Sequence, residues 1–597
     1  MDVEKLVPRM AFRVGITGTL NENAAEQTRE RIRAVLETVK QCVEKEWDEN
    51  PGTYRNESVT EGVNERASKP VLLYAISPLA EGADRIFAEE AIEPRYMLDA
   101  EGRRLVSLGY KLECPLPFRR EEYAQDFKRH AGSREAFEKL LGRAKGAVLE
   151  LDGIRADAGA YETVGRVVLD QCDLLIAVWD GQPAGGPGGT AHIMQIARNR
   201  VPMVCLRTDG RPDGLYLPGS NQPEEELTGD RLKDWLHRLL ETPWKRVANP
   251  DDPDVTGSYA NTTNLKPSFR GRLWRAFIRL MAAGCGAPAE TPERIPAGPF
   301  EDYYRHYDAL ANRLVGLYRG SFLASYSLGV LAVFLALLAY AHPLHFAIRQ
   351  FEIDVWAAGE LIAIAMVFRI VFSVRNQRLH YRSVDCRYLA EQFRVLCYLY
   401  PLGLTAPPLQ LPAHSQKQER KSWMEWRLRA LLRQTPMPSG AVSEDYLAGR
   451  HREVVEDWIR GQALYHKRNH KRMHCVETRL DWCIGIFASL AATACVLHFF
   501  IHDKAITPWL TLCAAGLPAW AAACHAIATQ GELRRLAERS EAMSHALSTI
   551  EKDLREEIKN SGLTLGVLRD KAQEAARLMV DEVADWQILY RKPVPLV

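Results

Sequence analysis

The sequence lacks a cysteine framework. Its twelve Cys residues are scattered along the chain without a Cys-x-x-Cys pair, and four of them lie inside strongly apolar stretches (Cys483, Cys495, Cys513 and Cys524). Cysteines in this pattern are typical of small buried hydrophobic residues in a reducing compartment. We therefore expect neither a disulfide scaffold nor a zinc site.

The chain also lacks net charge and a secretory leader. Its 77 Lys and Arg residues nearly balance 76 Asp and Glu residues, which leaves a formal net charge of +1. Such a chain has no general attraction for polyanions, so we expect no nucleic-acid partner. The opening MDVEKLVPRMAF has no apolar h-region, and we expect the N-terminal part to stay in the cytoplasm. A length of 597 residues predicts two or three folding units.

Long apolar runs occur in the second half of the chain. Residues 321–341 (SFLASYSLGVLAVFLALLAYA) carry no charge. At ~1.5 Å of rise per residue they are long enough to cross a hydrocarbon core of ~30 Å. Three further candidate spans cover residues 353–374, 481–501 and 506–528. The alternative for each run is a helix buried in a soluble core.

The segments between the spans predict how the chain crosses the membrane. Only HPLHFAIRQFE separates the first two spans and only HDKA the last two, so we expect two tight hairpins. Basic residues flank both hairpins on one side: Arg313, Arg319, Arg375, Arg378, Lys471, Arg472, Arg534 and Arg535. The positive-inside rule then predicts a multi-pass protein of the cell (inner) membrane with both termini in the cytoplasm.

The two hairpins look like copies of one unit. A long helix is expected before each pair of spans, and a charged amphipathic helix after each pair contains a Leu-Ala-Glu segment, in CRYLAEQFRVL and in ELRRLAERSEAM. The order helix, span, span, helix is therefore expected twice. Within the second span, Arg369 is expected to reach the cytoplasmic interface. Glu360 either faces a water-filled cavity, where it would favour cations, or lies at the far interface.

Three histidines recur every fourth residue at positions 466, 470 and 474. This spacing stacks them on one helix face and superficially indicates a metal site. Four neighbouring cations (Lys467, Arg468, Lys471 and Arg472) would repel a divalent ion. The segment instead suits anionic lipid headgroups just before a span, and we expect no metal.

The N-terminal third predicts strands that alternate with helices. Five β-branched or apolar segments are expected to be strands: FRVGITGTL, VLLYAISP, YKLECPLPF, CDLLIAVWDG and VPMVCL. Right-handed crossovers would bring their carboxyl ends to one edge of a parallel sheet. The predicted fold is an α/β Rossmann-like N-terminal domain plus an all-α membrane domain with two transmembrane helical hairpins.

Polar and glycine-rich turns after three of these strands form the candidate ligand site. The residues expected to contact the ligand are Gly15, Thr17, Gly18, Ser77, Glu81, Gly82, Asp84, Arg85, Asp180, Gly188, Gly189 and Thr190. Backbone amides in such turns, together with the helix starts that follow them, bind anions such as phosphates. The alternatives are ordinary strand-to-helix turns and a flexible surface loop.

Over residues 10–210 these turns resemble the SLOG superfamily, which includes the LOG phosphoribohydrolases and DprA-like proteins. The resemblance implies a Rossmann-like domain that binds a nucleotide or nucleotide derivative, with no other cofactor. LOG hydrolases carry a Pro-Gly-Gly-x-Gly-Thr-x-x-Glu motif whose Glu supports N-glycosidic cleavage. Here Ile193 stands at that position, and His192 is one residue out of helical phase. This departure favours ligand binding over hydrolysis.

The C-terminal half resembles the SLATT class of two-transmembrane effector domains, which accompany SLOG modules in bacterial conflict systems. The likeness lies in the order of helices and spans and in the segments RYLAEQFR and WIRGQALYHKRNH. Two tandem copies depart from the usual single one. The resemblance implies a homo-oligomeric, pore-forming effector in antiviral (antiphage) defence that acts when a nucleotide signal occupies the partner domain.

The predicted organisation has five parts: residues 1–215, a nucleotide-binding domain; 216–300, a polar connector or insertion; 301–400, a helix with the first hairpin; 401–450, a linker; and 451–597, a helix with the second hairpin and C-terminal helices. The leading hypothesis is a membrane effector that senses a nucleotide-derived signal. An alternative is a membrane-tethered LOG-like nucleotide hydrolase with Glu81, Asp84 or Glu122 as acid or base. A third is a structural membrane protein with a vestigial pocket.

Overall fold

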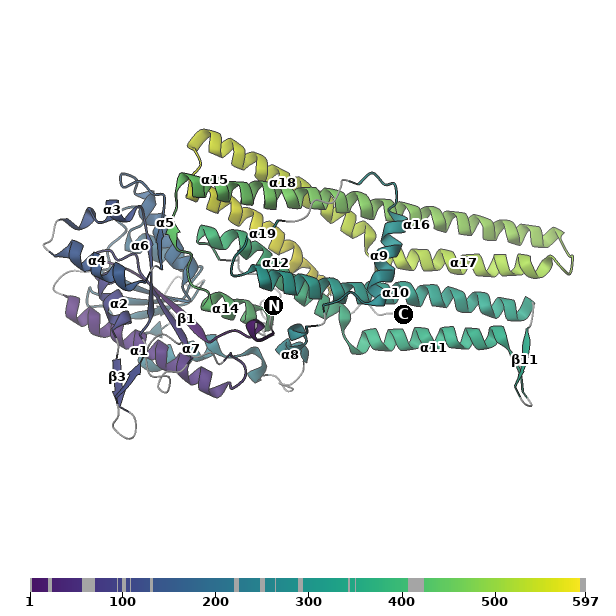
Figure 1. The fold of residues 1–597 in the computed structure, drawn as a ribbon, viewed down its shortest axis with the longest axis horizontal. Helices are drawn as coiled ribbons and strands as arrows, with labels where there is room; N and C mark the ends of the chain where they lie inside the picture. The colour runs from purple at the N-terminus through teal and green to yellow at the C-terminus, as the bar shows by residue number, and fades with distance from the viewer. Residues whose placement is uncertain are drawn as a thin grey trace.

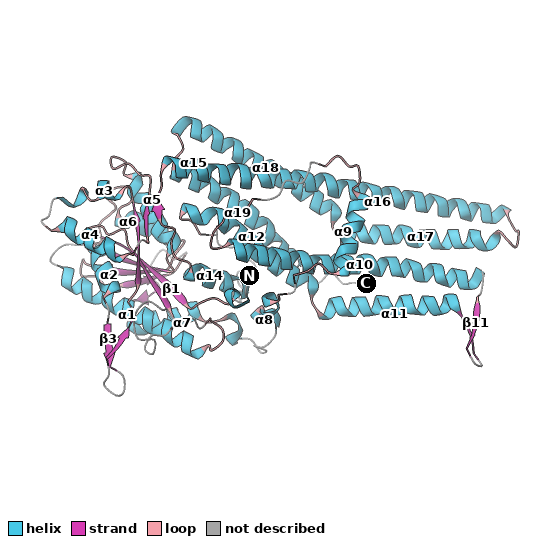
Figure 2. Ribbon diagram, viewed as in Figure 1, coloured by secondary structure: helices cyan, strands magenta, loops and turns pink. Residues whose placement is uncertain are grey.

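The computed structural model (Figure 1) describes residues 3–19, 24–55, 70–93, 95–98, 104–107, 109–128, 132–145, 147–218, 225–246, 253–263, 265–287, 294–341, 344–348, 351–405 and 423–590. Most of the predicted linker motif PLGLTAPPLQLPAHSQ lies outside these residues, as do parts of the predicted connector 216–300. The chain has an N-terminal α/β sheet region followed by a mostly helical part (Figure 2).

One sheet of the described chain has the order β10-β9-β8-β7-β1-β2-β5-β6-β13. Its strands are β1 (Ala11–Gly18), β2 (Leu72–Ile76), β5 (Lys111–Leu116), β6 (Val148–Glu150), β7 (Leu174–Trp179), β8 (Met203–Arg207), β9 (Gly214–Tyr216), β10 (Glu225–Glu226) and β13 (Gly440–Ala441). In this order, each pair of neighbouring strands from β8 through to β13 is parallel. At the other edge of the sheet, β9 is antiparallel to both β8 and β10. Gly15 of β1 is in register with Ile76 on one side and Leu175 on the other.

The central strands are apolar along almost their whole length because helices cover both faces of the sheet. These helices are α1 (Ala25–Glu49), α2 (Ala83–Ile92), α3 (Arg120–Tyr123), α4 (Ser133–Arg143), α5 (Gly159–Gln171), α6 (Thr190–Ala197) and α7 (Gly229–Leu240). α1 packs against α2 and α7, and α5 packs against β1 and α6. A separate hairpin of β3 (Arg95–Leu98) and β4 (Arg104–Ser107) projects from this region (Figure 1).

The helical part is built from long helices. They are α9 (Phe269–Met281), α10 (Glu301–Ala341), α11 (Val355–Asn376), α12 (Leu379–Leu399), α14 (Trp423–Gln434), α15 (Glu444–Arg452), α16 (Gly461–Phe500), α17 (Thr507–Gln530), α18 (Leu533–Ser561) and α19 (Leu565–Tyr590). A π-helical stretch, Glu453–Arg460, joins α15 to α16. β11 (His345–Ile348) and β12 (Phe351–Asp354) pair between α10 and α11. Short helical turns cover Val3–Leu6, Asp126–Lys128, Pro243–Arg246, Pro253–Thr256, Ser258–Asn261 and Tyr400–Leu402.

Four helical stretches are long and apolar enough to cross a membrane: Glu301–Tyr340, Val355–Asn376, Glu444–Phe500 and Thr507–Ser561. In their most apolar windows, no more than 28% of the residues are buried inside the protein. Large apolar side chains such as Phe368 and Phe499 are 72% and 79% exposed. A soluble core helix would bury these surfaces, so their exposure is consistent with a membrane protein.

The apolar parts of α10 and α16 lie beside α11 and α17, and together they form the end of the molecule that is farthest from the sheet (Figure 1). α10 contacts α11 and α17, and α16 contacts α17. In the middle of the molecule α12, α18 and α19 lie between these ends and the sheet, and α12 packs on both α10 and α19. The long helices therefore connect the sheet region continuously to the apolar end.

In both helical units a residue with positive φ separates the second apolar helix from the helix that follows it. Arg378 before α12 and Glu532 before α18 both have positive φ, at 45° and 53°, and the Leu that follows each is buried. The two Leu-Ala-Glu segments, however, begin at Leu389, 11 residues after Arg378, and at Leu536, four residues after Glu532. The order of helices repeats, but the two Leu-Ala-Glu segments do not occupy equivalent positions in α12 and α18.

Parts of the chain that the sequence assigns to connectors pack firmly in the structure. From residues 216–300, α7 packs on α1 and α9 packs on α10. From residues 401–450, α14 packs on β1 and α12, and β13 adds a strand beside β6. Strand β13 is only two residues long, so local sequence carries no signal for it.

Candidate functional site

The strand order reverses between β1 and β7. The chain proceeds from β1 through β2 and β5 to β6 on one side, and then through β7 to β8 on the other. In open α/β sheets, ligands bind at the carboxyl ends of the strands beside such a switch point. The candidate site is therefore the carboxyl edge at Gly18 and Trp179, which we call the switch-point edge.

Gly18 ends β1 where three elements meet. A Cβ placed on Gly18 would lie 2.6 Å from the Ala83 Cβ of α2 and 2.8 Å from the Val178 Cβ of β7. Beside it, the hydroxyls of Thr19 and Thr190 are 2.9 Å apart. The predicted turns after the first, second and fourth strands are thus brought together at one edge.

The glycine-rich turn before α6 rests on the start of α5. Gly188 has a φ of 80°, and a Cβ there would lie 2.6 Å from the Tyr161 carbonyl carbon. Its amide donates to His192 Nδ1 at 3.1 Å, and the Gly189 amide donates to the Gly186 carbonyl at 3.2 Å. Glycine is required at position 188 because any side chain would be both strained and in collision with backbone.

Two helices point their N-terminal ends at this edge. Gly82 precedes α2 with a φ of 93°, and Gly189 precedes α6. Neither cap makes a side-chain hydrogen bond within the described chain. Uncapped amides and the positive end of the helix dipole favour an anion.

Three of the predicted ligand residues face inward instead. Ser77 Oγ donates to the Asp84 carbonyl at 2.9 Å and accepts from the Leu79 amide at 3.1 Å. Arg85 donates to the Leu79 carbonyl and to Ser133, and its guanidinium lies 4.2 Å from the Phe127 ring centroid. These side chains hold the start of α2 in place through contacts within the protein.

Asp84 is also buried, at 4% exposure. Its Oδ1 has no hydrogen-bond donor among the described residues. Burial raises the pKa of Asp84 to about 8, although the nearby Arg85 charge opposes the shift. The carboxyl is therefore largely protonated at neutral pH and adds little negative charge near the anion-favouring helix start.

The other predicted residues have mixed surroundings. Gly15 lies within β1, where a Cβ would come within 2.8 Å of Val168, so its role is close packing of α5. Thr17 is half-buried in the same strand and pairs with Ala177. Glu81 is exposed and accepts a hydrogen bond from Ser133. Asp180 Oδ1 accepts from the Gln182 amide at 3.0 Å and shapes the turn after β7.

The structure adds polar residues that the sequence reading did not single out. Tyr161 donates to Asp126 Oδ2 at 2.8 Å, and Arg155 forms an ion pair with the same carboxylate. Burial and the neighbouring carboxylate raise the pKa of Tyr161, which keeps its hydroxyl protonated. Tyr161 follows Gly159 at the start of α5, and this helix start was the available sequence signal.

A carboxylate at position 193 has no place in this arrangement. Ile193 is 2% exposed, and a Cβ on Gly165 of α5 would lie 2.4 Å from its Cδ1. His192 Nδ1 accepts from Gly188 and lies 4.0 Å from Glu162 Oε2. Glu162 of α5, rather than a residue of α6, is the acid closest to this turn among these contacts.

Helix α5 links the switch-point edge to the helical part. At its start it contacts the Gly188 turn, and at its end Asp170 Oδ2 lies 2.8 Å from the Arg569 guanidinium of α19. Arg569 also donates to the Leu402 carbonyl at 2.7 Å, and Gln171 donates to the Gly403 carbonyl at 3.1 Å. One helix therefore touches both the candidate site and the bundle.

A second link is a buried charge network centred on Arg13 of β1. Arg13 forms an ion pair with Glu113 of β5 and donates to the Thr435 carbonyl at 2.8 Å. Glu113 accepts from the Met437 amide at 2.9 Å, and Arg433 donates to Asp173 at 2.7 Å. The segment between the two helical units is thereby fixed to the sheet.

Of the three histidines at positions 466, 470 and 474, the rings of His470 and His474 stack with their centroids 6.0 Å apart, whereas His466 is buried. Burial lowers the pKa of His466 to about 4, and His470 Nδ1 lies 3.0 Å from the Ala537 carbonyl. In the part of the chain that the structure describes, no group of three His, Cys, Asp or Glu side chains is arranged to hold a metal ion.

The chain matches no protein-family model, no curated protein and no solved structure. Its resemblance to the SLOG and SLATT groups therefore stays a prediction. The fold and the contacts of the described residues are the basis for assigning a function.

Proposed function

We propose that the protein is a membrane effector of the SLOG and SLATT kind. Its cytoplasmic sheet region binds a nucleotide-derived anion at the switch-point edge. Occupancy of that edge then shifts the four apolar helices toward a state in which the membrane is permeable. The protein acts as a homo-oligomer in the inner membrane, in bacterial antiphage defence.

The observation that carries the proposal is the position of α5. Its first turn lies under the Gly188 turn, and its last turn holds Arg569 of α19 through Asp170. α19 packs on α12, and α12 packs on α10, which contains the first apolar run. A ligand that moves the Gly188 turn is therefore connected to an apolar helix through a short series of packed elements.

The anion would be bound mainly by backbone groups. The uncapped starts of α2 and α6 supply amides, and the hydroxyls of Thr19 and Thr190 supply donors for a phosphate or ribose. Gly18, Gly82, Gly188 and Gly189 would allow the close approach. Binding can change the helices only if the ligand has a different affinity for the two states of the protein.

The proposed topology is two transmembrane hairpins with both termini in the cytoplasm. It is supported by the common direction of the apolar ends, away from the sheet (Figure 1). Basic residues on the side of the sheet, such as Arg375 in the last turn of α11 and Arg535 just after α17, follow the positive-inside pattern. The paired strands β11 and β12 would then lie on the far side of the membrane.

The test uses the full-length protein in liposomes loaded with potassium. AMP, ADP-ribose and cyclic di-AMP are added separately, and potassium efflux and nucleotide turnover are recorded together. The proposal predicts that at least one nucleotide binds, persists unhydrolysed and accelerates efflux. Sustained turnover without efflux would support the membrane-tethered phosphoribohydrolase instead, and an absence of binding would leave a structural membrane protein.

The matched control pair compares Gly188→Ala with Gly210→Ala. Both glycines have positive φ, 80° and 82°, but a Cβ on Gly210 meets nothing within 4 Å. Both variants therefore carry similar backbone strain, whereas only Gly188→Ala displaces the turn from α5. Nucleotide-dependent efflux should be lost in Gly188→Ala and retained in Gly210→Ala.

A further inference from the structure

Glu360 lies in the apolar helix α11 and lines a cavity. The cavity measures about 430 Å³ and lies between α10 and α11, with Gly329 and Leu337 of α10 in its wall, and it is open on the side away from these two helices. Among the described residues that line it, Glu360 alone is charged. A carboxylate at membrane depth is costly unless water or a cation reaches it, so such a residue in a cavity indicates a functional role.

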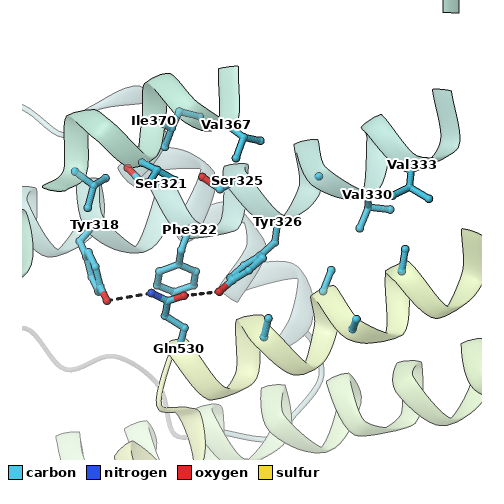
Figure 3. A pocket seen from close by; sticks show the side chains of 17 residues that line it. Tyr318, Ser321, Phe322, Ser325, Tyr326, Val330, Val333, Val367, Ile370 and Gln530 are labelled. Carbon is cyan, nitrogen blue, oxygen red and sulfur yellow. Dashed lines mark hydrogen bonds between the residues drawn. The ribbon is translucent and has the colours of Figure 1, made fainter. Parts of the chain in front are cut away.

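A second cavity adjoins the first. It measures about 440 Å³ and lies over α10 between α11 and α17 (Figure 3). The two cavities share Gly329, Val333 and Val367 in their walls. They therefore adjoin in the middle of the apolar region, where the side chains of Val333 and Val367 line both, and we refer to the two together as the hollow.

The near end of this hollow is polar. Tyr326 donates to Gln530 Oε1 at 2.5 Å, and Gln530 Nε2 lies 3.4 Å from the Tyr318 hydroxyl (Figure 3). Ser321 and Ser325 of α10 line the same cavity. Oxygen atoms therefore gather where the apolar run of α10 begins, on the side of the sheet.

The length of the hollow matches a bilayer. Tyr318 and Leu337, at its two ends on α10, are 19 residues apart. At ~1.5 Å per residue this is ~28 Å, against ~30 Å for the hydrocarbon core. Polar groups thus lie at one end and Glu360 toward the other, with an apolar middle.

We propose that this hollow is part of the path of a monovalent cation, and that each chain contributes α10, α11 and α17 to its wall. Glu360 attracts the cation at the far side, and Tyr318, Tyr326 and Gln530 receive it at the near side. Val333 and Val367 form a hydrophobic constriction that stays dry in the resting state. The proposal rests on the proposed function, because it specifies where that permeability arises.

The arrangement also explains how the sheet region reaches the constriction. Val333 is part of α10, the helix on which α12 packs, and α12 packs on α19. A shift of α10 relative to α11 would change the separation of Val333 and Val367. Water then enters the middle of the hollow, and the cation passes.

The test records ion currents from the full-length protein in planar bilayers under a potassium chloride gradient. Glu360→Gln removes the charge without changing the shape, and it should lower the ratio of potassium to chloride permeability by about tenfold. Asp481→Asn, at an exposed acid in the middle of α16 where its apolar run begins, should leave the ratio unchanged.

The double substitution Val333→Ser with Val367→Ser wets the constriction. It should give current without any nucleotide, whereas Ile362→Ser, at a lipid-facing side chain that is 61% exposed, should not. If nucleotides open the wild type but all four variants behave like it, the cation path is wrong while the proposed function stands. If nucleotides never open the wild type but the double substitution passes potassium, the path stands and the proposed gating fails.

Discussion

Removal of Arg569 should destabilise the contact between the sheet region and the helical part. Its guanidinium is 2.8 Å from Asp170, and the two side chains are 5% and 10% exposed. Burial lowers the pKa of Arg569 and raises the pKa of Asp170, so both groups resist ionisation there and each depends on the other. The substitution Arg569→Met keeps most of the volume but leaves the Asp170 charge without its main partner.

The expected cost follows from the contacts. Breaking a buried ion pair by removing one partner costs about 3–5 kcal/mol. Arg200 lies 3.5 Å from Asp170 and stays in place, which points to the lower end of that range. The hydrogen bond from Arg569 to the Leu402 carbonyl is also lost, at about 1 kcal/mol. We expect a total of about 3–4 kcal/mol for Arg569→Met.

The assay is chemical denaturation of the full-length protein in mild detergent, followed by tryptophan fluorescence. The double variant Asp170→Asn with Arg569→Met neutralises both groups and should recover about 2 kcal/mol of the loss. Two results would refute the reasoning: a cost below about 1 kcal/mol for Arg569→Met, or a double variant no more stable than the single one.

Two further predictions concern the switch-point edge. Gly18→Val places a side chain where Ala83 and Val178 already leave no room. It should weaken the binding of AMP or ADP-ribose at least about tenfold in calorimetric titration. Unchanged affinity would exclude this edge as the site. The folded protein holds a proton on the Asp84 carboxyl up to pH about 8, whereas the unfolded chain releases that proton near pH 3.8. The protonated carboxyl therefore stabilises the fold fully below pH 4, and this contribution to the free energy of unfolding is lost as the pH rises to about 8. Asp84→Asn should flatten the decline in the free energy of unfolding between pH 4 and 8, and an equally steep pH profile would show that Asp84 ionises normally.

The elements that the sequence predicted are those with a local signal. The five predicted strands correspond to β1, β2, β5, β7 and β8, and the four apolar runs lie within or closely match four long helices. Periodicity and composition suffice for such elements. Strand β6 has three residues and β13 has two, and segments that short carry no usable periodicity.

The contacts that tie the molecule together had no local signal. Arg569 meets Asp170 across 399 positions, and Met437 meets Glu113 across 324. Side-chain direction was equally hidden: the spacing of Ser77, Asp84 and Arg85 marked the start of a helix, but only packing decides that these side chains turn inward. That the backbone amides of the same turn bind an anion stays a prediction.

The central claim is that a nucleotide at the switch-point edge controls the apolar helices. Potassium efflux from liposomes that contain the full-length protein tests it most directly, with ADP-ribose, AMP or cyclic di-AMP added from outside to inward-facing and outward-facing preparations. The account predicts faster efflux with one of these nucleotides when the sheet region faces it, and no response in Gly188→Ala. Equal efflux with and without every nucleotide, or an undiminished response in Gly188→Ala, would contradict it.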